Sequence, residues 1–200
     1  MTRLPAPLTT RRSCLGWLAL AALAGCADKA PSFRGIDVTG AGYGKALSLK
    51  DPDGRTRTLA DFQGKAVLLF FGFTQCPDVC PTALLRAAEV RRLLGADGDR
   101  LQVLFVTLDP ERDTPQVLRE YTGAFDPGFL GLAGDLAETE QIAKEFRVYF
   151  KKVPTQSSYT IDHSAFTYLF DPAGQLRVLL KHEQTAQDYA ADVRTVLSRA

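Results

Sequence analysis

Residues 66–81 read AVLLFFGFTQCPDVCP, and this stretch decides the fold of the chain. Its first half, Ala66 to Phe73, is a continuous run of apolar residues, which is typical of a strand buried on both faces of an α/β sheet. Its second half carries Cys76 and Cys80, followed by Pro81, a residue that suits the first turn of a helix. The stretch therefore predicts a buried strand, a loop with two cysteines and a helix.

The flanking sequence continues this alternation of strands and helices. Residues 101–108 (LQVLFVTL) predict a second buried strand. Shorter strands are expected at 46–49, 56–59, 166–170 and 176–180. Helices are expected at 81–94, 114–122, 136–146 and 186–198. This order predicts an α/β fold with a central mixed sheet, helices on both faces and an N-terminal β-hairpin.

The composition is that of an ordinary globular protein. Of 200 residues, 46% are hydrophobic and 24% are charged, with a formal net charge of +1. Residues 1–25 hold three arginines and no acidic residue, so the remainder has 21 basic and 23 acidic residues, a net charge of −2. A nearly neutral domain gives no electrostatic reason to expect nucleic-acid binding.

The first 26 residues predict an export signal. Arg11 and Arg12 precede an apolar run of 11 residues that ends at Gly25, shorter than the roughly 20 residues that span a bilayer. The run closes in Leu-Ala-Gly-Cys, which resembles a bacterial lipobox and implies cleavage before Cys26 and a lipid on its sulfur. An uncleaved N-terminal anchor is the alternative. The paired arginines also resemble a twin-arginine signal, so the export route stays open.

These features divide the chain into three expected parts. Residues 1–25 are expected to be a lipoprotein signal peptide and residues 26–45, rich in Gly, Ala, Lys and Asp, a lipidated tether. Residues 46–200 are then the folded domain. We expect this domain to lie on the periplasmic side of a bacterial cell envelope, attached to a membrane through the lipid.

The two cysteines of the expected domain are candidates for chemistry. If the first turn is helical, residues four apart share a face, so the sulfurs of Cys76 and Cys80 would point the same way. The helix N-terminus favours thiolate, the form that binds metals and attacks disulfides. The only methionine is Met1, so a soft metal ligand in the domain has to be cysteine. A structural disulfide is the alternative.

Two thiolates need a third ligand, and an imidazole completes a set that suits copper better than zinc. His163 comes just before the expected strand 166–170, which should lie near the strand ending at Phe73. His182 lies at the far end of a hairpin and is expected to be solvated. His163 is therefore the better candidate, with a capping or surface histidine as the alternative. Two nearby carboxylates could orient the ligands or serve in docking: Asp78 and Asp162.

Three motifs together resemble the Sco (SenC) family: CPDVCP at 76–81, VTLDPERDTP at 106–115 and DHS at 162–164. The resemblance covers about residues 45–198. It implies a thioredoxin-like fold and a metallochaperone rather than an enzyme. Such a protein delivers copper to the CuA centre on subunit II of cytochrome c oxidase, or keeps the cysteines of that centre reduced.

The same resemblance implies a site and its partners. The implied ligands of one copper ion, Cu(I) or Cu(II), are Cys76, Cys80 and His163. The two cysteines would also form a redox-active disulfide. Implied partners are the CuA subunit and other copper or thiol-redox proteins. Residues 109–115 would form a connecting loop, which we interpret as structural, with a partner-docking role as the alternative.

Three rival functions remain. A thiol-disulfide oxidoreductase on the same fold would use Cys76 and Cys80. Typical reductases have a two-residue spacer and a cis-proline facing the site, whereas this chain has a three-residue spacer and Ser-Ala-Phe at 164–166. A peroxidase of the peroxiredoxin type would need Thr-x-x-Cys, but Thr74 is one residue too close to Cys76. The third rival is a binding scaffold without chemistry.

Overall fold

Strands β4 (Ala66–Gly72) and β5 (Leu101–Thr107) form the centre of the fold in the computed structural model, which describes residues 32–199. Every residue of β4 is buried, and so is every residue of β5 except Gln102. The strands pair in parallel, from Ala66 opposite Leu101 to Gly72 opposite Thr107. Their carboxyl ends therefore lie side by side, where α/β proteins usually bind ligands.

These two strands belong to a six-stranded mixed sheet in the order β1-β10-β9-β4-β5-β6. On one side, β6 (Leu130–Leu132) pairs in parallel with β5. On the other, β9 (Thr167–Phe170) pairs antiparallel with β4, and β10 (Leu176–Leu180) pairs antiparallel with β9. The chain that enters β9 thus arrives beside the carboxyl end of β4, as the sequence predicted.

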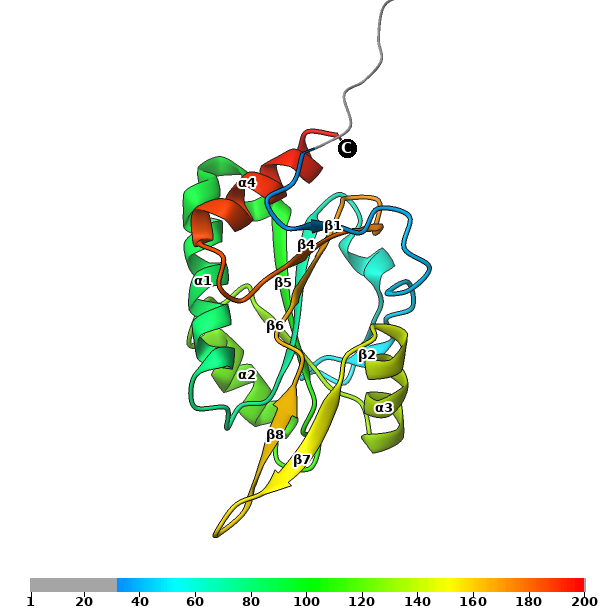
Figure 1. Ribbon diagram of the computed structural model, residues 1–200, viewed down its shortest axis with the longest axis vertical. Coiled ribbons are helices and arrows are strands. Elements are labelled where there is room, and N and C mark those ends of the chain that lie inside the picture. Colours follow the sequence, from blue (N-terminus) through cyan, green and yellow to red (C-terminus); the bar gives the residue numbers. More distant parts are fainter. Residues whose placement is uncertain (1–31, 200) are drawn as a thin grey trace, which may run out of the picture. The chain divides into compact units, whose positions relative to one another are not determined.

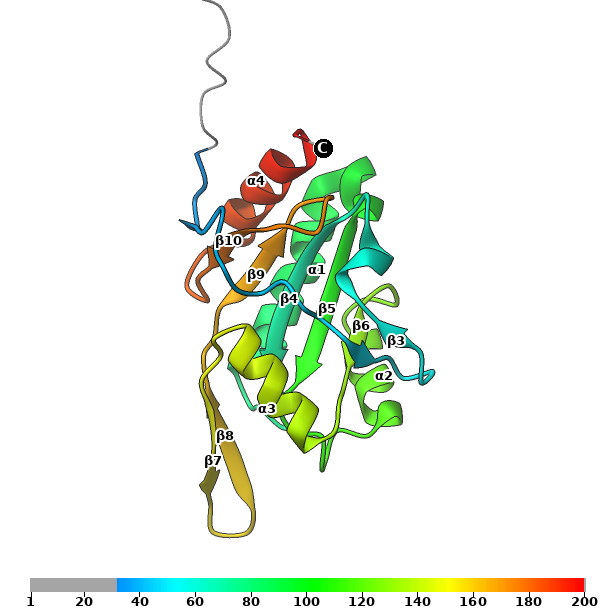
Figure 2. The same ribbon diagram turned by 90° about the vertical axis from the view of Figure 1, so that its right-hand side faces the viewer.

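Helices cover both faces of this sheet (Figures 1 and 2). On one face α1 (Val79–Leu94) packs against α4 (Ala186–Leu197), and on the opposite face lies α3 (Leu136–Glu145). The shorter α2 (Pro115–Gly123) packs beside β6. Buried residues of α1 recur at helical spacing and face the sheet: Cys80, Ala83, Leu84, Ala87, Val90 and Leu94. The predicted α/β architecture is confirmed.

Capping residues set where these helices begin. The hydroxyl of Thr114 accepts a hydrogen bond from the amide of Val117, and Pro115 occupies the first position of α2. Helices α3 and α4 begin with reciprocal capping boxes, in which two side chains three residues apart each accept a hydrogen bond from the backbone amide of the other residue. The pairs are Asp135 with Glu138 in α3 and Thr185 with Asp188 in α4. Local sequence therefore determines the start of each of these three helices.

The N-terminal hairpin is also present as β2 (Leu49–Lys50) and β3 (Thr56–Arg57). The buried carboxylate of Asp51 accepts hydrogen bonds from the amides of Asp53 and Arg55 and pairs with the Arg57 guanidinium. These interactions fix the turn between the two strands.

Part of the range that composition predicted as a tether packs against the domain. Strand β1 (Ile36–Asp37) pairs with β10, and the carboxylate of Asp192 accepts hydrogen bonds from the amides of Arg34 at 2.7 Å and Gly35 at 2.8 Å. The segment is held through its backbone amides and carbonyls. The composition of its side chains therefore did not indicate that it packs against the domain.

A second hairpin, β7 (Phe150–Pro154) with β8 (Tyr159–His163), was not predicted. It forms a separate two-stranded sheet that extends away from the six-stranded sheet (Figures 1 and 2). Its register places Phe150 opposite His163. His163 is therefore the last residue of a strand and not part of a loop, which restricts where its imidazole can point.

The proposed signal peptide and the lipidation site at Cys26 lie outside the described residues and stay predictions. In residues 32–199 the structure contains no helix with the length and apolar character required to cross a membrane.

Candidate metal centre

Cys76 and Cys80 lie at the junction of β4 and α1. The amide of Cys76 donates to the carbonyl of Phe73 at 3.2 Å, and α1 begins only at Val79. Cys76 is therefore in the loop before the helix, so the prediction that helical spacing aligns the two sulfurs is wrong. The turn brings them together instead, and the sulfur of Cys76 accepts a hydrogen bond from the amide of Cys80 at 3.5 Å.

The sulfur of Cys80 is buried against the last residue of β4. Cys80 is fully buried, whereas Cys76 is partly exposed. A Cβ atom added at Gly72 would lie 2.7 Å from the Cys80 sulfur and 2.9 Å from Cε2 of Phe105. Glycine at position 72 thus leaves the space that the sulfur occupies.

His163 reaches the cysteines from the end of β8. Its Nδ1 lies 2.9 Å from the backbone carbonyl oxygen of Ser164, and because a carbonyl only accepts, Nδ1 carries the proton. In the neutral ring Nε2 then keeps the lone pair that can bind a metal, and this atom lies 3.7 Å from the Cys80 sulfur. The rings of Phe70 and Phe73 contact the imidazole edge-on and restrict its rotation.

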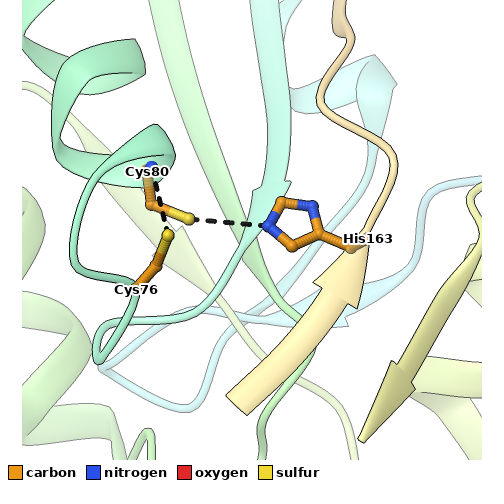
Figure 3. A group of neighbouring side chains, drawn as sticks. All are labelled: Cys76, Cys80 and His163. Carbon is orange, nitrogen blue, oxygen red and sulfur yellow. Dashed lines mark hydrogen bonds between the residues drawn. The ribbon is translucent and has the colours of Figure 1, made fainter. Parts of the chain in front are cut away.

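Figure 3 shows these three side chains converging from the cysteine loop, the start of α1 and the end of β8. One ligand atom from each of Cys76, Cys80 and His163 lies within 4.8 Å of the others. Metal–sulfur and metal–nitrogen bonds of about 2.0–2.3 Å hold ligand atoms at most about 4.6 Å apart. Small side-chain rotations are therefore enough for all three atoms to bind one ion. Two sulfurs with a neutral imidazole are a donor set that suits copper.

The two thiols differ in acidity. A hydrogen bond from the Cys80 thiol lowers the pKa of Cys76, and the backbone amides of Asp78 and Cys80 act in the same direction against burial. The same hydrogen bond, together with burial, raises the pKa of Cys80. Without a metal, Cys76 is the thiolate and Cys80 holds the proton. A metal ion bound by both sulfurs displaces that proton.

Asp113 anchors the cysteine loop, a role that the sequence did not reveal. Its carboxylate accepts hydrogen bonds from the amide and hydroxyl of Thr74, at 3.0 and 2.5 Å, and from the hydroxyl of Thr107 at 2.6 Å. Burial raises the pKa of Asp113 despite these donors. The signal for this role was the DPERDTP motif, which the sequence interpretation treated only as a connecting loop.

The side chains of the remaining candidates are not members of the three-ligand group. Asp78 is exposed at the N-cap of α1. Asp162 is exposed as well, and strand alternation places it on the opposite face of β8 from His163. The prediction that His182 is solvated is wrong, because it is half-buried and its Nδ1 is buried without a hydrogen-bond partner among the described residues.

Comparison with known proteins agrees with this geometry. The family model described as SCO1/SenC matches residues 38–198. Protein sco1 of Schizosaccharomyces pombe is 41% identical over 152 residues, which cover 74% of this chain and 58% of that protein. The SCO2-like protein of Rickettsia felis is 37% identical over 142 residues, which cover 70% of this chain and 68% of that protein. This chain thus spans less than two thirds of the first relative's length.

Solved structures show the same relationship. The copper-bound structure of ScoI from Bradyrhizobium japonicum is 42% identical, with a TM-score of 0.69, and the match covers 76% of this chain and 97% of that one. The thioredoxin-like α/β fold expected from the motifs is confirmed by this neighbour. The family match over residues 38–198 and these identities establish that the chain belongs to the SCO1/SenC family.

Proposed function

We propose that this protein is a membrane-anchored copper metallochaperone that holds one copper ion with Cys76, Cys80 and His163. The observation that carries the proposal is the convergence of their three ligand atoms within 4.8 Å. Thiolates with a neutral imidazole suit Cu(I), which accepts three ligands, and also support Cu(II). The copper bound in the 42% identical ScoI of Bradyrhizobium japonicum supports the same choice of metal.

The client that we propose is the CuA centre on subunit II of cytochrome c oxidase, as the Sco resemblance implies. Other copper or thiol-redox proteins are further proposed partners. Transfer needs an open side from which an incoming ligand can approach, and the partial exposure of Cys76 beside the buried Cys80 provides one. We place the protein on the periplasmic side of the bacterial envelope, attached to a membrane through a lipid on Cys26.

A second candidate function is the reduction of a client disulfide. It is favoured by the difference in pKa between the thiols of Cys76 and Cys80. The lowered pKa of Cys76 makes it the attacking thiolate. It would form a mixed disulfide with one client sulfur and release the other as a thiol. Cys80, after losing its proton, would then attack the Cys76 sulfur. This step releases the second client thiol and leaves a Cys76–Cys80 disulfide, which an external dithiol has to reduce again.

Anaerobic titration of the reduced protein with Cu(I) tests the main proposal. We expect one copper per chain in the wild type and loss of that tight site in Cys76→Ser and in Cys80→Ser. His182→Ala serves as a control, because this imidazole lies outside the three-ligand group. A full equivalent of tightly bound copper in either cysteine variant would contradict the proposed site. Release of two client thiols by the metal-free protein, but not by Cys76→Ser, would support the second function.

A further inference from the structure

Arg112, in the loop after β5, contacts both segments that carry the proposed copper ligands. One of its terminal nitrogens, Nη1, donates to the side-chain oxygen of Gln75 at 3.0 Å, and Gln75 adjoins Cys76. The same nitrogen donates to the backbone carbonyl of Tyr159 at 2.9 Å, at the start of β8. The guanidinium also lies 3.7 Å from the centre of the Tyr159 ring. One largely buried side chain therefore joins the cysteine loop to the strand that ends in His163.

The hairpin that carries His163 is held by the packing of Ile161 in the core and by polar contacts with this loop. Strands β7 and β8 pair only with each other and not with the six-stranded sheet. Apart from the contacts that His163 itself makes, the polar contacts that link strands β7 and β8 to the rest of the described domain end on three loop residues. Lys152 pairs with Glu111 at 2.6 Å, the Tyr159 hydroxyl donates to Asp109 at 2.8 Å, and the remainder involve Arg112.

The loop that carries Arg112 is itself held in place, on the side of the site where the cysteines lie. Asp109 is fully buried and pairs with Arg112, which restricts the guanidinium. The neighbouring residue, Asp113, binds Thr74 of the cysteine loop through two hydrogen bonds. Two adjacent residues thus hold the two halves of the site, Asp113 the cysteine side and Arg112 chiefly the histidine side.

Arg112 is held in this position although one of its donors is left unused. Its Nη2 is buried and has no hydrogen-bond partner among the described residues. A buried unpaired donor opposes stability, so maximal stability alone does not account for this arrangement. Apart from the pair with Asp109, the hydrogen bonds that Arg112 makes connect its loop to the cysteine loop and to the hairpin. A planar guanidinium suits this task, because it donates in several fixed directions and stacks on an aromatic face at the same time.

We propose that Arg112 is a positioning residue that sets the distance between the His163 imidazole and the two cysteine sulfurs. This inference rests on the proposed function, since it treats those three residues as copper ligands. Without the guanidinium, the hairpin loses its link to Gln75 and its stacking partner. The imidazole then samples positions farther from the sulfurs, while Asp113 keeps the cysteine loop in place. Binding of Cu(II), which needs the nitrogen ligand, suffers more than binding of Cu(I), which two thiolates can hold.

The test compares Arg112→Ala with Arg119→Ala in the full chain. Arg119 is a matched control, because it forms an exposed ion pair with Asp53 away from the site. For Arg112→Ala we expect Cu(II) affinity to fall by about 10-fold or more, as is typical when residues that orient metal ligands are removed. Electron paramagnetic resonance should show weaker nitrogen coupling to Cu(II), while Cu(I) affinity changes by less than about 3-fold. Arg119→Ala should match the wild type.

A metal-free measurement separates this inference from the proposed function. Hydrogen–deuterium exchange of residues 150–163 should rise in Arg112→Ala and not in Arg119→Ala. If the wild type binds no copper, the proposed function fails, and unchanged exchange in Arg112→Ala would then show that Arg112 does not position the hairpin either. If the wild type binds copper but Arg112→Ala keeps its exchange and its nitrogen coupling, only the role of Arg112 is overturned.

A second variant covers the case in which Arg112→Ala does not fold. Tyr159→Leu removes the stacking surface and the hydroxyl that donates to Asp109, and it leaves the ion pair between Arg112 and Asp109 in place. Tyr159→Phe is its control, because it removes only the hydroxyl. Circular dichroism identifies which variants are folded. Tyr159→Leu should shift exchange and nitrogen coupling in the same direction as Arg112→Ala, and wild-type values for both in folded Tyr159→Leu would overturn the proposal.

Discussion

The Nε2 atom of His163 lies 3.7 Å from the sulfur of Cys80, although the two residues are 83 positions apart in the chain. The first comes from the end of β8 and the second from the first turn of α1. A bond from Nδ1 to the Ser164 carbonyl leaves the free lone pair of the imidazole on the side of the sulfur. This arrangement makes the histidine a ready metal ligand in the metal-free protein.

Replacing His163 by alanine should weaken copper binding while the domain stays folded. The imidazole is only half-buried and contacts the edges of two phenylalanine rings, so its loss leaves the core intact. Because a direct ligand is removed, Cu(II) affinity should fall by at least the roughly 10-fold seen for supporting residues. Competition titration with a chelator measures the change. His182→Ala is the control, and a larger loss in that variant would show that the ligand assignment is wrong.

Gly72→Ala should disturb the site through packing. The added methyl group would lie 2.7 Å from the Cys80 sulfur and 2.9 Å from a Phe105 ring carbon, so one of them has to move. Overpacking of this kind lowers the free energy of unfolding by about 1–3 kcal/mol. Urea denaturation measures the loss, and absorption of the copper complex should change as the sulfur shifts. Gly123→Ala, where the new methyl group meets no side chain within 4 Å, should not lower the free energy of unfolding and should leave the absorption unchanged.

Alkylation of Cys76 should depend little on pH across the neutral range. At pH values below its pKa of about 8.5, an ordinary thiol has a thiolate fraction that rises about tenfold for each unit increase in pH. The pKa of Cys76 is lowered by its hydrogen bond with Cys80, so its thiolate is already formed well below that range. Iodoacetamide rates, with the site of modification read by mass spectrometry, should stay nearly flat from about pH 6 to about pH 8. A tenfold rise per unit would contradict the assignment of Cys76 as the thiolate.

Cys80 serves as the internal comparison in that experiment. Burial and the hydrogen bond with Cys76 raise its pKa, and its sulfur is enclosed. It should therefore remain unmodified over the same range of pH. Faster modification of Cys80 than of Cys76 would reverse the roles given to the two thiols in the second proposed function.

Cys26→Ser should release the protein from membranes, because a serine hydroxyl cannot carry the thioether-linked lipid. Fractionation of cells expressing each form, followed by immunoblotting, measures the distribution. Cys14→Ser is the matched control, since this cysteine lies inside the expected signal peptide. Retention of the Cys26→Ser variant in the membrane fraction would support an uncleaved N-terminal anchor in place of a lipid.

The residue pattern alone was enough to predict the strands and helices that depend on interactions between neighbouring residues. The apolar runs at 66–73 and 101–108 are long enough to be buried on both faces, and they form the central parallel pair. Capping residues such as Thr114 and Asp135 determine where their helices begin. The three motifs at 76–81, 106–115 and 162–164 together also identified the family, because their residue types and spacing can be recognised without any knowledge of distance.

Only the tertiary structure decided how the site is assembled. The hairpin that carries His163 was missed because its pattern is short and uneven: in β8 Ile161 is buried in the core and Asp162 is exposed, whereas β7 is mostly exposed and shows no alternation. The sulfurs meet through a turn that precedes α1 and not through helical spacing. The links from Arg112 and Asp113 to the two halves of the site join residues 37 to 47 positions apart. Contacts between such distant residues depend on the path of the whole chain, which local sequence patterns do not encode.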